Sequence, residues 1–123
     1  MGIRISREQA AAMGLEPPKR HKYGAKPKVV DGIRFDSTKE ARRYGELALM
    51  LRAGAIRELR CHPRYELHAA NGEVVGQYEA DFEYRETASD QLVTEDVKGV
   101  RTRMFKLKKK LFEAEYGWQI TEV

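Results

Sequence analysis

The chain has 123 residues, of which 41% are hydrophobic and 34% are charged, and its formal net charge is +4. This length suits one domain with a single core, and the composition excludes a disordered chain. No apolar run approaches the ~20 residues that cross a bilayer, so a membrane protein is also excluded. Cys61 is the single cysteine, so we expect no intrachain disulfide and a cytoplasmic location.

The first part of the chain carries signals of a helix, a linker and a hairpin. Residues 6–14 have the capping-box spacing and the terminal glycine of a short helix, and the Pro-Pro pair at 17–18 begins a basic linker. We therefore expect an N-terminal segment over residues 1–27 and a folded domain over residues 28–123. At the start of that domain, Asp31-Gly32 predicts the tight turn of a hairpin.

A helix is predicted from Ser37 to Ala53, followed by a terminating glycine. Its apolar line runs through Tyr44, Leu47 and Leu51, and Glu40 lies on the same line one turn earlier. Glu40 should therefore point inward. Its spacing from Ser37 also fits a capping box, in which its side chain would bond back to the Ser37 amide, and this alternative stays open.

The middle of the chain reads as strands. Residues 56–60 and 64–70 should form one strand with a break at Pro63, and an Asn-Gly pair at 71–72 predicts the next hairpin turn. Alternating apolar residues from Tyr78 to Tyr84 predict a second strand, and residues 92–98 a third.

A helix and a strand should complete the domain. The helix is predicted over residues 102–116 and the strand over residues 118–123. The resulting order of helix, three antiparallel strands, helix and strand indicates an α/β domain with a mixed sheet. The residues expected to form the buried stripe of this last helix are Met104, Leu107, Leu111 and Ala114, with help from Phe105 and Phe112.

Two aspartates and a lysine should meet on this sheet. Asp96 and Lys98 share a face because they are two apart in a strand, and Asp81 comes from the neighbouring strand. Paired carboxylates suit a hard cation such as Mg²⁺, and a lysine beside them can stabilise charge that develops on a phosphate. The Asp-x-Lys triplet alone is weak evidence, because chance supplies about one or two Asp/Glu-x-Lys triplets in such a chain. A surface charge cluster is the alternative.

Basic residues gather in the linker and in the last helix, as they do in proteins that bind a phosphate backbone. A solvated helix face beside a basic tail would look the same. Arg101 and Arg103 lie at the start of the last helix, where positive charges interact unfavourably with the helix dipole. A phosphate bound between them would make this arrangement favourable, which favours DNA contact. The residues expected to touch DNA are Lys22, Lys26, Lys28, Arg101, Arg103, Lys106, Lys109 and Lys110.

Five stretches carry a family resemblance: Lys28–Ser37, Lys39–Tyr44, Ala80–Phe82, Glu95–Gly99 and Lys106–Phe112. In this order they resemble the PD-(D/E)xK nuclease superfamily, and more closely a family of small, mostly phage- and prophage-encoded nuclease-like proteins. The resemblance implies a restriction-endonuclease-like core. In that core a central mixed sheet, of three antiparallel strands plus a following strand, is flanked by helices.

The resemblance also implies roles for the site residues. Asp81 and Asp96 would ligate the metal with help from the Val97 carbonyl, Lys98 would be the motif lysine, and Glu40 would match the first-helix glutamate beside the metal. The chain departs from the common motif at two positions: Ala80 stands where the motif has proline, and Asp96 stands where glutamate is commoner.

Other acidic and metal-binding residue types are weaker candidates. Glu95 faces away from Lys98, so it is expected at the surface or in an ion pair. Cys61 and three scattered histidines, among them His62, fail the usual spacing of a zinc site. His62 is expected to be an ordinary histidine at a strand break, with contact to DNA as the alternative.

Together these features predict a Mg²⁺- or Mn²⁺-dependent DNA endonuclease that cuts branched or junction DNA in phage recombination or repair. Two symmetric cuts would need two sites, which indicates a homodimer. A phage or host recombination protein is a further expected partner. Two alternatives stay open: a DNA-binding or recombination accessory module that does not cut, and a catalytic subunit that needs a targeting partner.

Overall fold

The computed structural model describes residues 27–98 and 101–123, which form a short N-terminal part and a larger part that begins at Lys39. The short part contains an antiparallel hairpin of β1 (Lys28–Val30) and β2 (Ile33–Phe35). The predicted Asp-Gly turn is confirmed, because Asp31 and Gly32 have φ angles of 53° and 77°. The helix predicted over residues 6–14, together with Lys22 and Lys26, lies outside the described residues.

Helix α2 (Thr38–Arg52) confirms the helix predicted from Ser37 to Ala53. Gly54 follows it with a φ of 80°, the left-handed conformation with which many helices end. Of the predicted apolar line, Leu47 is fully buried, whereas Leu51 at the end of the helix is 42% exposed. Glu40 is 5% exposed, so it does point inward.

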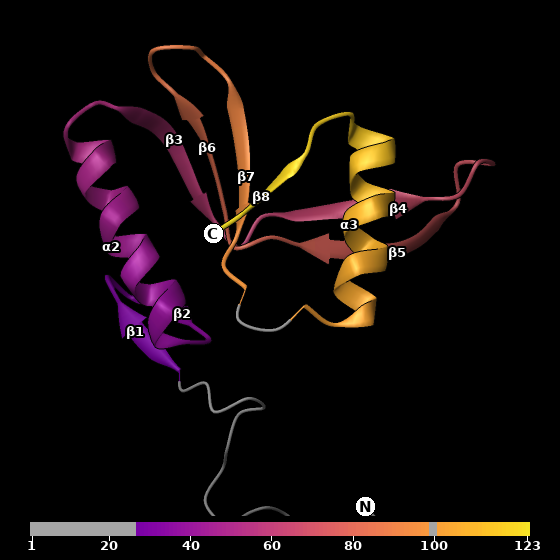
Figure 1. Cartoon of the computed structure of the whole chain (residues 1–123), viewed down its shortest axis with the longest axis horizontal. Coiled ribbons are helices and arrows are strands. Elements are labelled where there is room, and N and C mark those ends of the chain that lie inside the picture. Colours follow the sequence, from indigo (N-terminus) through magenta and orange to yellow (C-terminus); the bar gives the residue numbers. More distant parts are fainter. Residues whose placement is uncertain (1–26, 99–100) are drawn as a thin grey trace, which may run out of the picture. The chain divides into compact units, whose positions relative to one another are not determined.

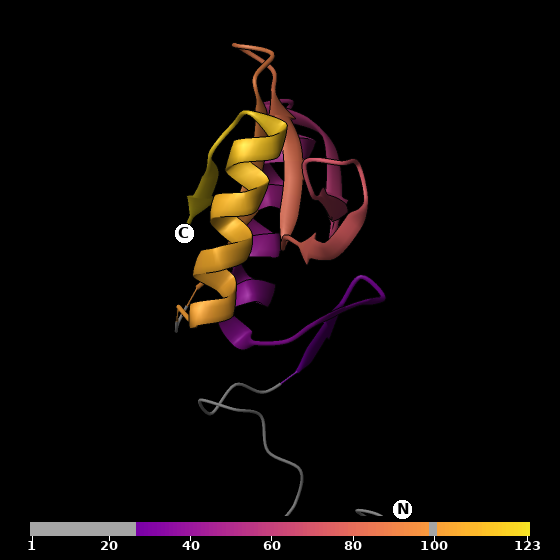
Figure 2. The ribbon, with the colours of Figure 1, turned by 90° about the vertical axis from the view of Figure 1, so that its right-hand side faces the viewer.

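A four-stranded mixed sheet forms the centre of the larger part, in the order β3-β6-β7-β8. Strands β3 (Ile56–Cys61), β6 (Phe82–Glu86) and β7 (Leu92–Asp96) are antiparallel, and β8 (Ile120–Glu122) runs parallel to β7. Helix α3 (Arg103–Tyr116) connects β7 to β8. It lies on the opposite face of the sheet from α2 (Figures 1 and 2). The predicted α/β class with a mixed sheet is therefore confirmed.

Two predictions of a single strand are wrong, one over residues 56–70 with a break at Pro63 and one from Tyr78 to Tyr84. In both places the chain forms two strands that belong to different sheets. Strand β4 (Arg64–His68) continues β3 beyond His62-Pro63 but pairs only with β5 (Val74–Glu79), which β6 follows beyond Ala80-Asp81. The physical cause is a shared bend. Pro63 has no amide hydrogen to donate, and His62 adopts a φ of 55°, so the ladder turns at this point.

The buried face of α3 also differs from the prediction. The predicted stripe is largely exposed, with Met104, Leu107 and Leu111 at 59%, 51% and 39%, whereas Phe105 and Phe112 are buried. The helix is turned toward its aromatic side because Phe112 packs into a cluster of rings that a Leu/Met face could not fill as well. The rings within 6 Å of Phe112 belong to Tyr65, Tyr78, Tyr116 and Trp118.

Within the described ranges, neither helix has the length and apolar character that a membrane span requires.

Candidate metal centre

Asp81 lies where the chain bends from β5 into β6, and its backbone is held from two sides. Its carbonyl accepts a hydrogen bond from the His62 amide (2.9 Å), and its amide donates to the Glu95 carbonyl on β7 (3.0 Å). Beside it, the Ala80 amide donates to the Pro63 carbonyl (3.0 Å). The bend therefore places Asp81 at the end of β7, next to the residues of the Asp-x-Lys triplet.

The Asp81 side chain turns toward the backbone that follows β7. Its Oδ2 accepts a hydrogen bond from the Val97 amide at 2.6 Å. Burial raises the pKa of Asp81, while this hydrogen bond and the nearby Lys98 ammonium lower it. The Asp81 carboxylate thus contacts the backbone of Val97, inside the Asp-x-Lys triplet, while its expected approach to the Asp96 carboxylate stays a prediction.

Asp96 is the last residue of β7 and is 1% exposed. Lys98 Nζ lies 3.3 Å from its Oδ1, and the Tyr78 hydroxyl donates to its Oδ2. Burial raises the pKa of Asp96 to about 6, even though Lys98 acts in the opposite direction. Lys98 also lies 4.2 Å from the ring centre of Phe105 in α3, a cation–π contact that holds the ammonium at this end of the strand.

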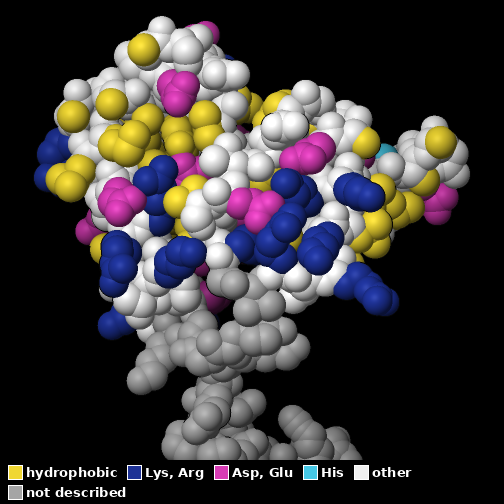
Figure 3. Space-filling model, viewed as in Figure 1, with side chains coloured by type: hydrophobic (Ala, Val, Ile, Leu, Met, Phe, Trp, Pro, Cys, Tyr) yellow, Lys and Arg dark blue, Asp and Glu magenta, His cyan; other side chains and the backbone are white. Residues whose placement is uncertain are grey.

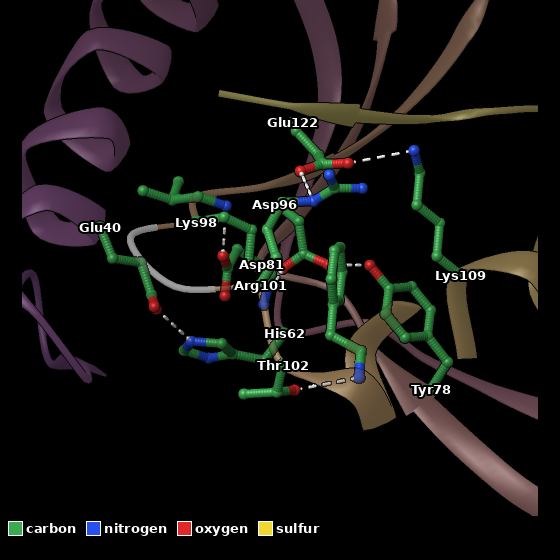
Figure 4. A network of polar contacts seen from close by, with 12 residues as sticks. Glu40, His62, Tyr78, Asp81, Asp96, Lys98, Arg101, Thr102, Lys109 and Glu122 are labelled. Carbon is green, nitrogen blue, oxygen red and sulfur yellow. Dashed lines mark hydrogen bonds and ion pairs between the residues drawn. The ribbon is translucent and has the colours of Figure 1, made fainter. Parts of the chain in front are cut away.

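Glu40 reaches the same region from the first turn of α2 (Figure 4). Its Oε1 lies 3.0 Å from Nε2 of His62. Burial, and next the charge of Asp81, raise the pKa of Glu40 to about 7, whereas the contact with His62 lowers it. Glu40 and Asp81 are thus neighbouring carboxyl groups in a partly buried place, where two negative charges are costly without a cation.

The cluster has the donors that a divalent cation prefers, although they are not gathered in one group. Among the residues described, no three His, Cys, Asp or Glu side chains form a ready-made metal-binding group. The structure instead joins Glu40 to His62 and Asp96 to Lys98. Mg²⁺ is commonly bound by one or two carboxylates, with waters and substrate phosphates as its other ligands. Asp81 and Asp96 fit that requirement, and the excess of buried carboxylates favours a cation.

Three further contacts were not identified from the sequence as parts of this cluster. Lys39 Nζ donates to the Lys98 carbonyl at 3.1 Å, which brings a second lysine to the end of β7. Tyr78 fixes Asp96, and His62 touches Glu40. The sequence offered one weak signal, since Lys39 and Glu40 are adjacent in the first turn of a predicted helix. The contacts of Tyr78 and His62 depend on the bend.

Glu95 was expected at the surface or in an ion pair, and only the ion pair is correct. It is 1% exposed and faces α2, on the side of β7 opposite to Asp96. The Arg43 guanidinium donates to both of its carboxylate oxygens, at 2.8 Å and 2.6 Å, and the Tyr84 hydroxyl donates to Oε2. In such a bidentate pair the guanidinium gives the buried carboxylate both charge and hydrogen-bond partners, with no need of a metal.

The basic residues expected to contact DNA fall into two groups in the described structure. Arg101 and Lys109 form ion pairs with Glu122 at 2.9 Å and 3.0 Å, so the charge of each is partly neutralised. Arg103, Lys106 and Lys110, here called the exposed α3 cations, are solvent-exposed, and Lys28 is exposed on β1. Figure 3 shows Lys and Arg side chains grouped over the region that α3 occupies in Figure 1.

Comparison with known proteins assigns the chain to a family but gives no information about its activity. A family model described as "Protein of unknown function (DUF1064)" matches residues 20–121. No curated protein matches the chain, and no solved structure matches it. The matched range includes every residue of the cluster described above.

Proposed function

The chain belongs to the DUF1064 family, and we propose that it is a metal-dependent DNA endonuclease of the PD-(D/E)xK type. One observation carries the proposal. Three carboxyl groups, Glu40 of α2, Asp81 of the bend before β6 and Asp96 of β7, are brought with Lys98 to one end of a mixed sheet. Two of them have a raised pKa near neutrality, which is common at functional sites and uncommon for structural surface charge.

The topology supports the same assignment. Three antiparallel strands, a helix and a parallel strand follow α2 in the order expected of a restriction-endonuclease-like core. The inserted β4-β5 hairpin leaves that order intact, because the chain returns to the sheet at β6.

In this proposal Asp81 and Asp96 would hold Mg²⁺ or Mn²⁺, and the Val97 carbonyl would be a further oxygen ligand. When bound, the cation supplies Lewis-acid stabilisation of a phosphodiester and of the attacking water. Lys98 provides a fixed positive charge for the phosphate oxygen on which negative charge grows, and Phe105 keeps its ammonium in place. Glu40 would stand beside the cation as a further oxygen ligand, directly or through a water whose hydrogen it accepts.

DNA is the proposed substrate because the exposed α3 cations present three positive charges to solvent along one helix, as a phosphate backbone requires. A domain this small has little surface for reading a long sequence, so cutting directed by DNA shape, at branches or junctions, is the proposed specificity. Two symmetric cuts would use a homodimer, and a phage or host recombination protein is a proposed partner. DNA would be met in the cytoplasm, which accords with a single cysteine in the chain.

The test is cleavage of labelled duplex, single-stranded, flap and four-way-junction DNA with Mg²⁺ or Mn²⁺. Wild type is compared with Asp96→Asn and Lys98→Met, and with Asp90→Asn as a matched surface control, since Asp90 is exposed. The proposal expects metal-dependent cutting by wild type and by Asp90→Asn, and a loss of at least about 100-fold in the other two variants. Metal-independent cutting, or cutting that survives both site variants, would contradict it.

The same substrates separate the two alternatives when DNA binding is also measured and a recombination protein is added in a parallel reaction. A wild-type protein that binds junction DNA as well as Asp96→Asn does, and cuts nothing, supports a non-catalytic accessory module. A wild-type protein that begins to cut only when a recombination protein is added supports a catalytic subunit that needs a partner.

A further inference from the structure

His62 contacts both acidic residues on one side of the candidate metal centre, through different atoms. Its backbone amide donates to the Asp81 carbonyl at 2.9 Å, and its Nε2 lies 3.0 Å from Glu40 Oε1. Its side chain is 28% exposed, while that of Glu40 is 7% exposed. Figure 4 shows the His62 imidazole directed at the Glu40 carboxylate. One residue therefore connects α2 to the bend that carries Asp81.

The backbone of His62 is unusual at this point. Its φ of 55° lies in the left-handed region, which histidine tolerates better than most residues but which still has a conformational cost. The following residue, Pro63, is buried, and its carbonyl accepts from Ala80. The bend thus holds the His62 side chain in a fixed direction, toward Glu40. Backbone strain of this kind often accompanies a functional site.

We propose that His62 is a positioning residue, which donates its Nε2 hydrogen to Glu40 and thereby fixes the direction of that carboxylate beside Asp81 for a divalent cation. This inference rests on the proposed function, because it concerns the same centre. A glutamate side chain has three rotatable bonds, and a hydrogen bond to one oxygen removes much of that freedom before a cation arrives. Outer partners of metal ligands act in this way, and their loss typically weakens metal binding or activity by about 10–100-fold.

A purely structural role for His62 is the competing explanation, in which only its left-handed backbone matters. Two substitutions separate the explanations. Asparagine accepts the left-handed backbone readily, but its amide nitrogen is too close to the backbone to reach Glu40. Glutamine can place an amide nitrogen near the position of Nε2, but it is less suited to the left-handed backbone. His62→Asn therefore keeps the preferred backbone and loses the contact with Glu40, whereas His62→Gln keeps the contact with a less favourable backbone conformation.

The experiment measures Mn²⁺ binding to the full chain without DNA by electron paramagnetic resonance, beside Tm and cleavage. The expected result is that His62→Asn binds Mn²⁺ about 10–100-fold more weakly with Tm near that of wild type. His62→Gln should bind within a few-fold of wild type even if its Tm falls. Cleavage at subsaturating Mn²⁺ should follow the same order, with glutamine rescuing what asparagine loses.

Two results would overturn the inference alone. In the first, His62→Asn binds Mn²⁺ as wild type does. In the second, the order is reversed, with asparagine active and glutamine impaired, which would assign His62 a backbone role only. A wild-type protein that binds no Mn²⁺ and cuts no DNA would instead overturn the proposed function and this inference with it. Circular dichroism of each variant corrects the Mn²⁺ data for any unfolded fraction.

Discussion

Replacing Asp96 with asparagine should make the metal-free protein more stable while removing its proposed activity. The carboxylate is 1% exposed, and burial raises its pKa from 3.8 to about 6. A change of that size corresponds to about 3 kcal/mol of unfavourable free energy for the ionised folded state at neutral pH. Asparagine removes the charge and can keep both contacts, accepting from Lys98 with its oxygen and donating to the Tyr78 hydroxyl with its nitrogen.

The sign of the effect depends on pH in a defined way. A carboxyl group with a raised folded-state pKa binds its proton more tightly in the folded state, so its ionisation weakens folding as pH rises from about 4 to about 6. Asparagine has no such titration. The stability gained from Asp96→Asn should therefore be small near pH 4, should grow through this window, and should level off above pH 6 at up to about 3 kcal/mol.

Urea unfolding followed by circular dichroism in EDTA, at several pH values, measures this difference. Asp90→Asn is the matched control, because Asp90 is exposed, asparagine also tolerates its φ of 61°, and its ion pair with Arg57 lies at the surface. Its effect should stay within about 1 kcal/mol. The reasoning is refuted if Asp96→Asn is less stable than wild type at pH 7.5 and the difference does not vary with pH. That result would mean that the Lys98 ion pair outweighs the burial of the charge.

Three other measurements examine separate parts of the structure. Arg43→Met should lower the free energy of unfolding by about 3–5 kcal/mol because Glu95 is left buried and unpaired, and adding Glu95→Gln should restore part of it; additive losses in urea unfolding would contradict this. Mn²⁺ at about 100 times its Kd should raise Tm by about 10 °C or more in a thermal melt, and an equal rise in Asp81→Asn would count against Asp81 as a ligand. Neutralising the exposed α3 cations with glutamine should reduce the salt dependence of DNA binding by about 2–3 in log–log slope, whereas an unchanged slope would remove them from the interface.

Local signals in the sequence were sufficient where one or two residues decide the conformation. Asp31-Gly32 and Asn71-Gly72 each specify a hairpin turn, and Gly117 ends α3 with a φ of 88°. Thr102 accepts a hydrogen bond from the Phe105 amide and starts the same helix. These turns and helix ends depend on the backbone preferences of one or two adjacent residues, so the local sequence is enough to predict them.

The rest depends on contacts between distant segments. Apolar residues alternate without interruption from Tyr78 to Tyr84, so the pattern could not reveal that the chain changes sheet at Asp81. Helix α3 has two adjacent apolar faces, one with Phe105 and Phe112 and one with Leu107. Phe112 is buried and Leu107 exposed because the aromatic cluster packs against the first face. The burial of Glu95 likewise needs Arg43, which is 52 positions earlier in the chain.

Strand β7 carries adjacent acidic residues whose side chains point to opposite faces of the sheet, and this has a consequence for strand register. Glu95 meets a guanidinium on the α2 side, and Asp96 meets an ammonium and a phenol on the other. A slip of one residue between β6 and β7 would exchange the two faces. Glu95 would then lose Arg43 and Asp96 would lose Tyr78, each in a buried place. Apolar alternation alone would specify such a short strand weakly. The two polar networks together specify the register of β7 against β6. Asp96, proposed for catalysis, therefore also stabilises the strand register that places it in the candidate metal centre.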